Sequence, residues 1–200
     1  TAEKKQLRRE MSLAMDDEIV ETAAESVSFH DLSGEYFQLS PVPREWYSDR
    51  TDVITQLGRE QDRRSVPEAL GDTLTEHASG NLVIIDSISD LVDAPTDDVG
   101  WDDVPVILKG ISRIAFEWGG MVLLHVSRES LDDRRHGQLV DAADGTLLFR
   151  WESGGSTRDR TMVVKQFRGV LSRIEAEDIV QFESEIHEGG YDLSNVRKIR

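Results

Sequence analysis

The sequence has no cysteine and only five prolines among its 200 residues. Without cysteine, neither a disulfide nor a cysteine-ligated zinc site can form. Long hydrophobic runs are also missing, because the longest ones, such as Met121 to Leu124, are far too short to cross a bilayer. The first residues lack the basic and then apolar pattern of a secretory signal. We therefore expect a cytoplasmic location and no role in a membrane.

Lysine is scarce as well. Only five of the 23 basic residues are lysine and the remaining 18 are arginine, against 39 acidic residues, which gives a formal net charge of −16. Such an acidic, lysine-poor and cysteine-free composition is typical of proteins from salt-in halophilic archaea, where high salt screens the self-repulsion. The alternative is an ordinary acidic cytosolic protein. A pI near 4.7 makes nucleic acid an unlikely partner, because duplex binding depends on cations that neutralise phosphates.

The hydrophobic pattern predicts helices that alternate with buried strands up to about Val126. Helices are expected at Lys4 to Met15, Thr51 to Gln61, from the N-cap Ser65 to about Ala78, and at Val104 to Trp118; strands are expected at Ser26 to Leu32, Asn81 to Asp86 and Met121 to Val126. The last two strands are so apolar that both of their faces should be buried, as in a parallel sheet.

The pattern changes after Val126. The polar segment from Ser130 to His136 is expected to be a mobile loop, and three strands should follow, at Gly145 to Trp151, Thr161 to Arg168 and Val180 to Ile186. The predicted fold class is therefore α/β, with a mostly parallel central sheet flanked by helices and extended by antiparallel strands near the C-terminus.

Asp86 is the first candidate for chemistry, because it follows four hydrophobic residues at the end of a predicted strand. Ligands bind at the carboxyl ends of strands in open parallel sheets, and this pattern is that of a Walker B strand, whose carboxylate helps to hold magnesium beside a phosphate. An aspartate that only caps the turn after a buried strand is the structural alternative.

A second polar cluster follows the next predicted strand and consists of His125, Ser127 and Arg128. Side chains at this position can sense a γ-phosphate or orient a water molecule. For His125 we favour the alternative of a core histidine with one satisfied nitrogen. Farther along, Lys165 and Arg168 lie near a strand end, where two cations can reach a phosphate on a neighbouring subunit, unless they are simply solvated.

Familiar catalytic motifs are missing from the sequence. It contains no G-x-x-x-x-G-K-[ST], H-E-x-x-H, G-x-S-x-G or G-x-G-x-x-G, and no glycine is followed by lysine. The Gly-rich stretch from Ser153 to Thr157 lies between predicted strands, lacks the lysine and opens no helix. The other histidines are scattered without metal-ligand spacing.

Several segments in the same order resemble the RecA superfamily and, within it, the KaiC-like ATPases of archaea. They are TAEKKQLRREM, VSFHDLS, NLVIIDSISDL, GGMVLLHVSRES, LVDAADGTLLFR, TMVVKQFRG and the pair Gly189-Gly190 with Tyr191. The resemblance covers nearly the whole chain and implies one RecA/KaiC-like domain over residues 1–200. The family's P-loop and paired catalytic glutamates are not matched, since the glutamate positions fall near Thr1 and Ala2. We expect the P-loop segment to lie upstream of Thr1 or to have been lost.

The resemblance also implies a site. The nucleotide-binding residues would be Asp86, Ser87, Ser127, Lys165 and Arg168, with Asp86 the carboxylate on the magnesium side. The implied cofactors are ATP and Mg²⁺, bound weakly or not at all by these 200 residues, because a P-loop would have to supply the backbone N–H groups that hold the phosphates. Self-association through RecA-like interfaces is implied as well.

Three functions remain open at this stage. The first is an ATPase-family domain with a regulatory or signalling role, whose enzymatic activity the sequence leaves undecided. The second is a non-catalytic module that binds a protein partner in signalling or transcription. The third is a recombinase-like accessory protein for single-stranded DNA, which the net charge of −16 disfavours.

Overall fold

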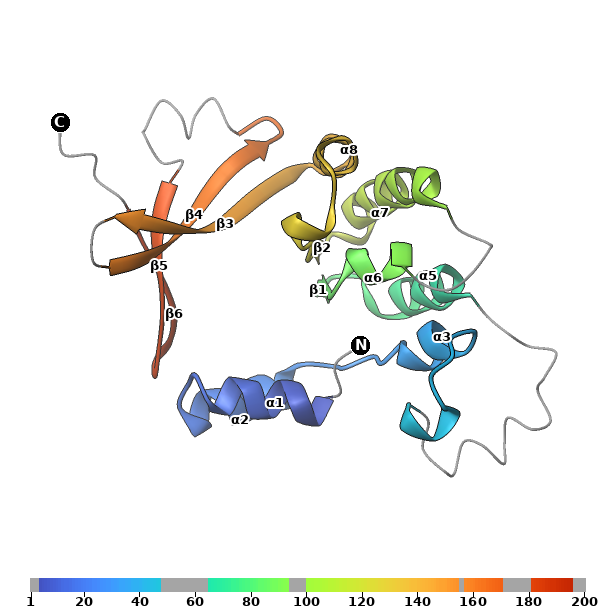
Figure 1. Cartoon of the computed structure of the whole chain (residues 1–200), viewed down its shortest axis with the longest axis horizontal. Helices are drawn as coiled ribbons and strands as arrows, with labels where there is room; N and C mark the ends of the chain where they lie inside the picture. Colours follow the sequence, from blue (N-terminus) through green and yellow to red (C-terminus); the bar gives the residue numbers. More distant parts are fainter. Residues whose placement is uncertain (1–3, 48–64, 94–99, 155–156, 171–180, 196–200) are drawn as a thin grey trace. The chain divides into compact units, whose positions relative to one another are not determined.

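The computed structural model describes residues 4–47, 65–93, 100–154, 157–170 and 181–195 (Figure 1). The chain divides into two compact units, one made of residues 29–142 together with the first three residues, and the other of residues 4–28 and 143–200. No described helix is long and apolar enough to cross a membrane. The helix predicted at Thr51 to Gln61 lies outside the described residues.

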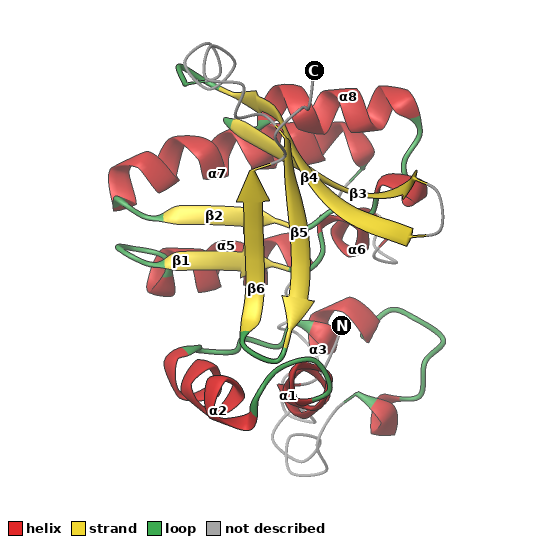
Figure 2. Ribbon diagram, turned by 90° about the vertical axis from the view of Figure 1, so that its left-hand side faces the viewer, coloured by secondary structure: helices red, strands yellow, loops and turns green. Residues whose placement is uncertain are grey.

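The unit formed by residues 29–142 contains the parallel strands. Its elements are α3 (Ser33–Phe37), η1 (Arg44–Trp46), α5 (Val66–His77), β1 (Leu82–Ile85), α6 (Ile88–Asp93), η2 (Trp101–Asp103), α7 (Val104–Trp118), β2 (Met121–Leu124), η3 (Arg128–Ser130) and α8 (Asp133–Ala142). Figure 2 shows β1 and β2 side by side and pointing the same way, in a register that pairs Leu82 with Met121 and Ile85 with Leu124.

Local sequence signals explain where these helices begin and end. Ser65 is the N-cap of α5 as predicted, and it forms a capping box: its hydroxyl accepts a hydrogen bond from the Glu68 amide, and the Glu68 carboxylate accepts one from the Ser65 amide. Helix α7 ends at Gly119, which takes a left-handed φ of 61°. The predicted helix at Val104 to Trp118 is thereby confirmed to the residue.

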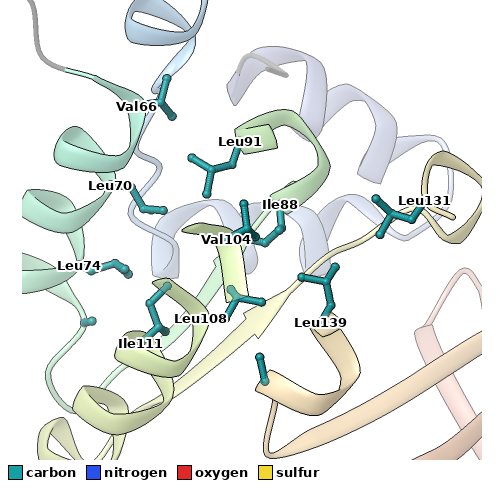
Figure 3. Packing of buried hydrophobic residues seen from close by; sticks show 12 residues of the cluster. Val66, Leu70, Leu74, Ile88, Leu91, Val104, Leu108, Ile111, Leu131 and Leu139 are labelled. Atoms are coloured by element: carbon teal, nitrogen blue, oxygen red, sulfur yellow. The ribbon is translucent and has the colours of Figure 1, made fainter. Parts of the chain in front are cut away.

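One hydrophobic core holds this unit together (Figure 3). Helices α5, α6, α7 and α8 all contribute to it, and the side chains at its centre are fully buried, with Ile88 at 0% exposure. The inward residues of the strands pack against this cluster: Val83, Ile85, Val122 and Leu124.

The outward faces of β1 and β2 correct one prediction. Leu82, Ile84, Met121 and Leu123 alternate with the inward residues and are exposed. The expectation that both strand faces are buried was therefore wrong in the described structure, where the helical core of this unit covers a single face.

The other unit combines two helices with a four-stranded antiparallel sheet. Its elements are α1 (Lys4–Ser12), α2 (Asp17–Ser26), β3 (Gly145–Gly154), β4 (Thr157–Phe167), β5 (Gln181–His187) and β6 (Gly190–Asn195), and the strand order is β3-β4-β5-β6. The amide of Asp16, which precedes α2, donates to the carbonyl of Glu188 in the turn between β5 and β6 at 2.8 Å. All strands predicted in the C-terminal region are confirmed.

Three further elements differ from the predictions. Residues 27–32 form neither helix nor strand, although a strand was expected there. Helix α8 begins inside the segment from Ser130 to His136 that was expected to be a mobile loop. The antiparallel strands form a sheet of their own among the described residues, whereas an extension of the parallel sheet was expected.

Candidate functional site

The candidate site lies at the carboxyl ends of β1 and β2. Asp86 follows β1 and His125 follows β2, and the parallel register brings the two residues to the same end of the strand pair. The His125 amide donates to the Ile85 carbonyl at 3.0 Å, and its carbonyl accepts from the Ile88 amide at 3.0 Å. The backbone of His125 thus fixes the chain on both sides of Asp86.

The side chains of Asp86 and His125 bind each other. Nδ1 of His125 lies 2.7 Å from Oδ1 of Asp86, and the two side chains are 65% and 67% exposed, respectively. The prediction that His125 is a core histidine was therefore wrong about its location, although one ring nitrogen is indeed satisfied. A hydrogen bond between two side chains this exposed contributes at most about 1 kcal/mol to stability, so the contact orients the two side chains more than it stabilises the fold.

A network of serines connects α6 with the segment after β2. The Ser127 amide donates to Oγ of Ser89 at 3.4 Å, and the Ser130 hydroxyl donates to the Ser127 carbonyl at 2.8 Å. Oγ of Ser127 lies 3.4 Å from a carboxylate oxygen of Glu129. Sequence reasoning selected Ser127 but missed Ser89 and Ser130. The Ser-x-Ser spacing directly after Asp86 is the signal from which Ser89 could have been selected.

Ser87 and Arg128 have structural partners. Oγ of Ser87 accepts from the Asp90 amide at 3.4 Å in the first turn of α6. The guanidinium of Arg128 donates to the Leu131 carbonyl at 2.8 Å and also binds the carboxylate of Asp133, in the first turn of α8. The guanidinium of Arg128 therefore connects the end of η3 with the first turn of α8.

A small cavity of about 80 Å³ adjoins Asp86. Apolar side chains of Leu32, Val66 and Leu70 line it, together with the polar residues Ser33, Tyr36, Ser87 and Asp90. The volume suits a few water molecules or one small polar group, and not a nucleotide base. A ligand at Asp86 would therefore occupy mainly the exposed side of the carboxylate.

Lys165 and Arg168 belong to the antiparallel sheet. The register of β3 and β4 shifts between Thr146 and Leu147, which leaves Lys165 as the extra residue on β4. Arg168 lies just beyond β4, where its amide donates to the Asp144 carbonyl at 2.8 Å and its guanidinium to the Asp144 carboxylate at 3.3 Å. The structure thus brings together Asp86, Ser87, His125 and Ser127 within one unit, and Lys165 and Arg168 within the other.

No group of three or more acidic or histidine side chains in the described part of the chain could hold a metal ion. A magnesium site here would depend on one carboxylate, waters and substrate phosphates, which is a common donor set for Mg²⁺. Asp86 fits that role, because its hydrogen bond to His125 uses Oδ1 and leaves Oδ2 for a metal-bound water.

No family profile and no curated protein sequence matches this chain. A solved KaiC-like protein of the archaeon Pyrococcus horikoshii is similar over 97% of this chain and 73% of its own, with a TM-score of 0.53 and 16% identity. The chain has a KaiC-like fold. The archaeal flagellar accessory protein FlaH of Methanocaldococcus jannaschii overlaps 57% of this chain, with a TM-score of 0.45 and 13% identity, and the chain spans about half of that protein.

The KaiC-like fold agrees with the fold that the order of sequence segments indicated. The strand expected before Asp86 is present as β1, which ends one residue before it. The likeness concerns the fold, and the role of each residue has to be argued from this chain alone.

A second histidine-aspartate pair, in the turn between β5 and β6, predicts a pH effect. The hydrogen bond between Nε2 of His187 and Asp192, 3.0 Å long, raises the pKa of His187 above its ordinary 6.5, and the charges of Asp192 and Glu185 add to this. The raised pKa means that the contact stabilises the hairpin below pH 6.5 and that this stabilisation is lost as the pH rises through the pKa of the folded state. We expect the Asp192→Asn variant to lower the pKa of His187.

An NMR titration of the imidazole protons measures that pKa directly. Glu185→Gln serves as the control, since it removes a more weakly coupled charge from the same strand and should lower the pKa less. A pKa of His187 that is unchanged in Asp192→Asn would show that the carboxylate does not act on the ring.

Proposed function

We propose that this chain is a KaiC-like regulatory domain that binds a magnesium nucleotide at the carboxyl ends of β1 and β2. The observation that carries the proposal is the position of Asp86, an exposed carboxylate directly after a core strand, paired with His125 directly after the neighbouring strand. Ligands of open parallel sheets bind at this edge. Asp86 would hold a metal-bound water, and magnesium, when bound, would neutralise phosphate charge.

Hydroxyl groups beside Asp86 suit the same ligand. Ser87 and Ser127 follow β1 and β2; Oγ of Ser87 accepts from the Asp90 amide, and the Ser127 amide donates to Oγ of Ser89, so that both residues are held in their turns. His125 would orient the Asp86 carboxylate through Oδ1. Lys165 and Arg168 are proposed to act on a nucleotide held by a neighbouring copy, with Asp144 holding the guanidinium of Arg168 at the start of β3.

Binding of Mg-ATP tests this proposal. We expect saturable binding of a fluorescent ATP analogue that strengthens when Mg²⁺ is added, and we expect Asp86→Asn to remove the magnesium effect. Asp102→Asn is the matched control, because Asp102 is an exposed acid in η2 and the change in charge is the same. The test is carried out in molar salt on this chain and, where the gene encodes a longer chain, on that chain as well.

The absence of binding at millimolar ATP in both proteins would overturn the proposal. Retention of the magnesium effect in Asp86→Asn would overturn the role of Asp86. If the full product hydrolyses ATP, Arg168→Ala is expected to reduce the rate, and an unchanged rate would reject the action of Arg168 on a neighbouring copy.

A second candidate function is a non-catalytic interaction module. It is favoured by exposed apolar side chains on regular elements, above all Phe116 on α7, which is 89% exposed. Binding of a protein partner without any nucleotide would support this candidate.

A further inference from the structure

The turn between β5 and β6 holds an imidazole ring that is bonded at both of its nitrogens. Nε2 of His187 lies 3.0 Å from Oδ2 of Asp192, and Nδ1 accepts a hydrogen bond from the Gly189 amide at 3.0 Å. A backbone amide can only donate, so Nδ1 carries no proton in this arrangement, and Nε2 carries the proton that Asp192 accepts. These hydrogen bonds therefore select one neutral tautomer of His187.

One peptide group connects this ring with the helices of the same unit. The Gly189 amide and the Glu188 carbonyl belong to the same peptide group, and that carbonyl accepts from the Asp16 amide at 2.8 Å. Hydrogen bonds therefore run from Asp16 through this peptide to the ring of His187, and the members of such a chain polarise one another. Figure 2 shows the turn at the ends of β5 and β6 that lie nearest to α1 and α2. Within the described ranges, the bond from Asp16 is the one backbone hydrogen bond between these helices and the antiparallel sheet.

Protonation of His187 is incompatible with this arrangement. A proton on Nδ1 turns that nitrogen into a donor that faces the N–H of Gly189, whereas Nε2 still donates to the carboxylate of Asp192. The contact is close, because a Cβ atom at Gly189 would lie 3.0 Å from Cε1 and 3.2 Å from Nδ1 of His187. Either the ring or the peptide has to turn, and Asp192 holds the ring at Nε2.

Glycine makes the peptide the part that can turn. Rotation of the peptide between Glu188 and Gly189 changes φ of Gly189, and a residue without a Cβ atom takes positive and negative φ about equally well. A second glycine follows, Gly190, with a φ of 120°. Because the N–H and C=O of a trans peptide point in opposite directions, a turned peptide presents its carbonyl to the protonated Nδ1 and withdraws it from the Asp16 amide.

The charged side chains around the ring favour its protonation. The Asp192 carboxylate raises the pKa of His187 above its ordinary 6.5, mainly through the hydrogen bond, and the charge of Glu185 on β5 adds to this. Further exposed acids in the segments that meet at this turn are Glu188, Asp16 and Asp17. The midpoint of protonation therefore lies above pH 6.5, and the turn is protonated below it.

We propose that the turn between β5 and β6 is a proton-operated clasp, in which protonation of His187 turns the peptide between Glu188 and Gly189 and releases the Asp16 amide. In the neutral state the clasp fixes the start of α2 to the sheet. In the protonated state the ion pair of His187 with Asp192 keeps the hairpin closed, while α1 and α2 lose their backbone bond to it. No residue of the candidate nucleotide site takes part, so the clasp is independent of the proposed function.

Amide hydrogen exchange of the whole chain, followed by NMR as a function of pH, tests this proposal. Each rate is compared with the intrinsic rate of the same amide at the same pH, so that the remaining protection reports structure alone. We expect protection at Asp16 to fall about two- to tenfold as His187 is protonated, which corresponds to the loss of one hydrogen bond. The shift of the Gly189 amide should change with the same midpoint. The Val20 amide, which donates to the Asp16 carbonyl within α2, should keep its protection.

Variants connect the loss at Asp16 with His187. Asp192→Asn should move the midpoint of this loss to lower pH, together with the pKa of His187, and His187→Gln should make protection at Asp16 independent of pH. His77→Gln is the matched control, because it makes the same change at another exposed histidine, at the end of α5, and should leave the transition in place.

Circular dichroism across the pH range establishes that each variant is folded, and the unmodified chain alone already decides the main point. The proposal is overturned if protection at Asp16 stays constant while His187 titrates, or if the two midpoints differ. It is equally overturned if the His187→Gln variant keeps the transition, or if the pKa of His187 moves in Asp192→Asn and the midpoint at Asp16 does not.

Discussion

Replacement of Ile88 by alanine is expected to lower the free energy of unfolding of the parallel-strand unit by about 2–5 kcal/mol. Ile88 is 0% exposed and lies in the cluster formed by α5, α6, α7 and α8 (Figure 3). Truncation removes the transfer free energy of the side chain and leaves a cavity that the surrounding helices can fill only in part. Unfolding in urea, followed by circular dichroism, measures the loss.

Ile84→Ala is the control for this prediction. The chemical change is the same, but Ile84 is exposed on the outer face of β1, so its loss should cost less than about 1 kcal/mol. Because the Ile88 amide is bonded to the His125 carbonyl, hydrogen exchange at this amide should also accelerate in Ile88→Ala. Equal effects of the two alanine variants would contradict the assignment of Ile88 to the centre of the core.

The position of Ile88 connects the core with the candidate site. It follows Asp86 by two residues and opens α6, so its burial fixes the turn that carries Asp86 and Ser87. A site on a rigid turn loses little conformational entropy when it binds a ligand. The loss of stability in Ile88→Ala should therefore be accompanied by weaker binding of any ligand at Asp86.

Much of the fold could be predicted from periodicity and caps. The apolar spacing predicted helix α7 from Val104 to Trp118, and the N-cap Ser65 predicted the start of α5. The run of β-branched residues before Asp86 gave β1. These signals are local and strong, and tertiary contacts reinforce them rather than oppose them.

Other elements depend on contacts that a single sequence does not reveal. The segment at the start of α8 is rich in charge, and its pattern predicts a loop, but Leu139 and Ala142 anchor the helix in the core and Asp133 binds Arg128 at its start. The exposed outer faces of β1 and β2 were equally unpredictable, because an apolar strand looks the same whether one or two layers cover it.

Only part of the candidate site could be predicted from the sequence, because some of its features are local and others depend on tertiary contacts. Asp86 could be selected because a carboxylate after a buried strand is a local pattern. The partnership with His125 depends on the parallel pairing of β1 with β2, across 39 residues of chain. The residues next to His125 in the sequence predict neither this register nor the exposure of its side chain.

Replacement by alanine of Gly110, within α7, and of Gly120, just after it, should change the free energy of unfolding in opposite directions. A Cβ atom at Gly120 would lie 2.7 Å from the Asn81 carbonyl oxygen and 2.9 Å from that of Ala78. Both neighbours are backbone atoms that hold the entry to β1, where the Met121 amide donates to the same Asn81 carbonyl at 3.1 Å. Since backbone cannot rotate away as a side chain can, we expect Gly120→Ala to lower the free energy of unfolding by about 1–3 kcal/mol.

Gly110 provides the matched comparison within α7. A Cβ atom there meets nothing within 4 Å, and the residue lies in the helix interior, where alanine is favoured over glycine by about 0.8–1 kcal/mol. Gly110→Ala should therefore raise the free energy of unfolding, while Gly120→Ala lowers it, in the same urea titration. A Gly120→Ala variant as stable as the unmodified chain would show that the crossing of α7 with the start of β1 is looser than the structure describes. Destabilisation in both variants would instead show that the side of α7 at Gly110 is packed against something.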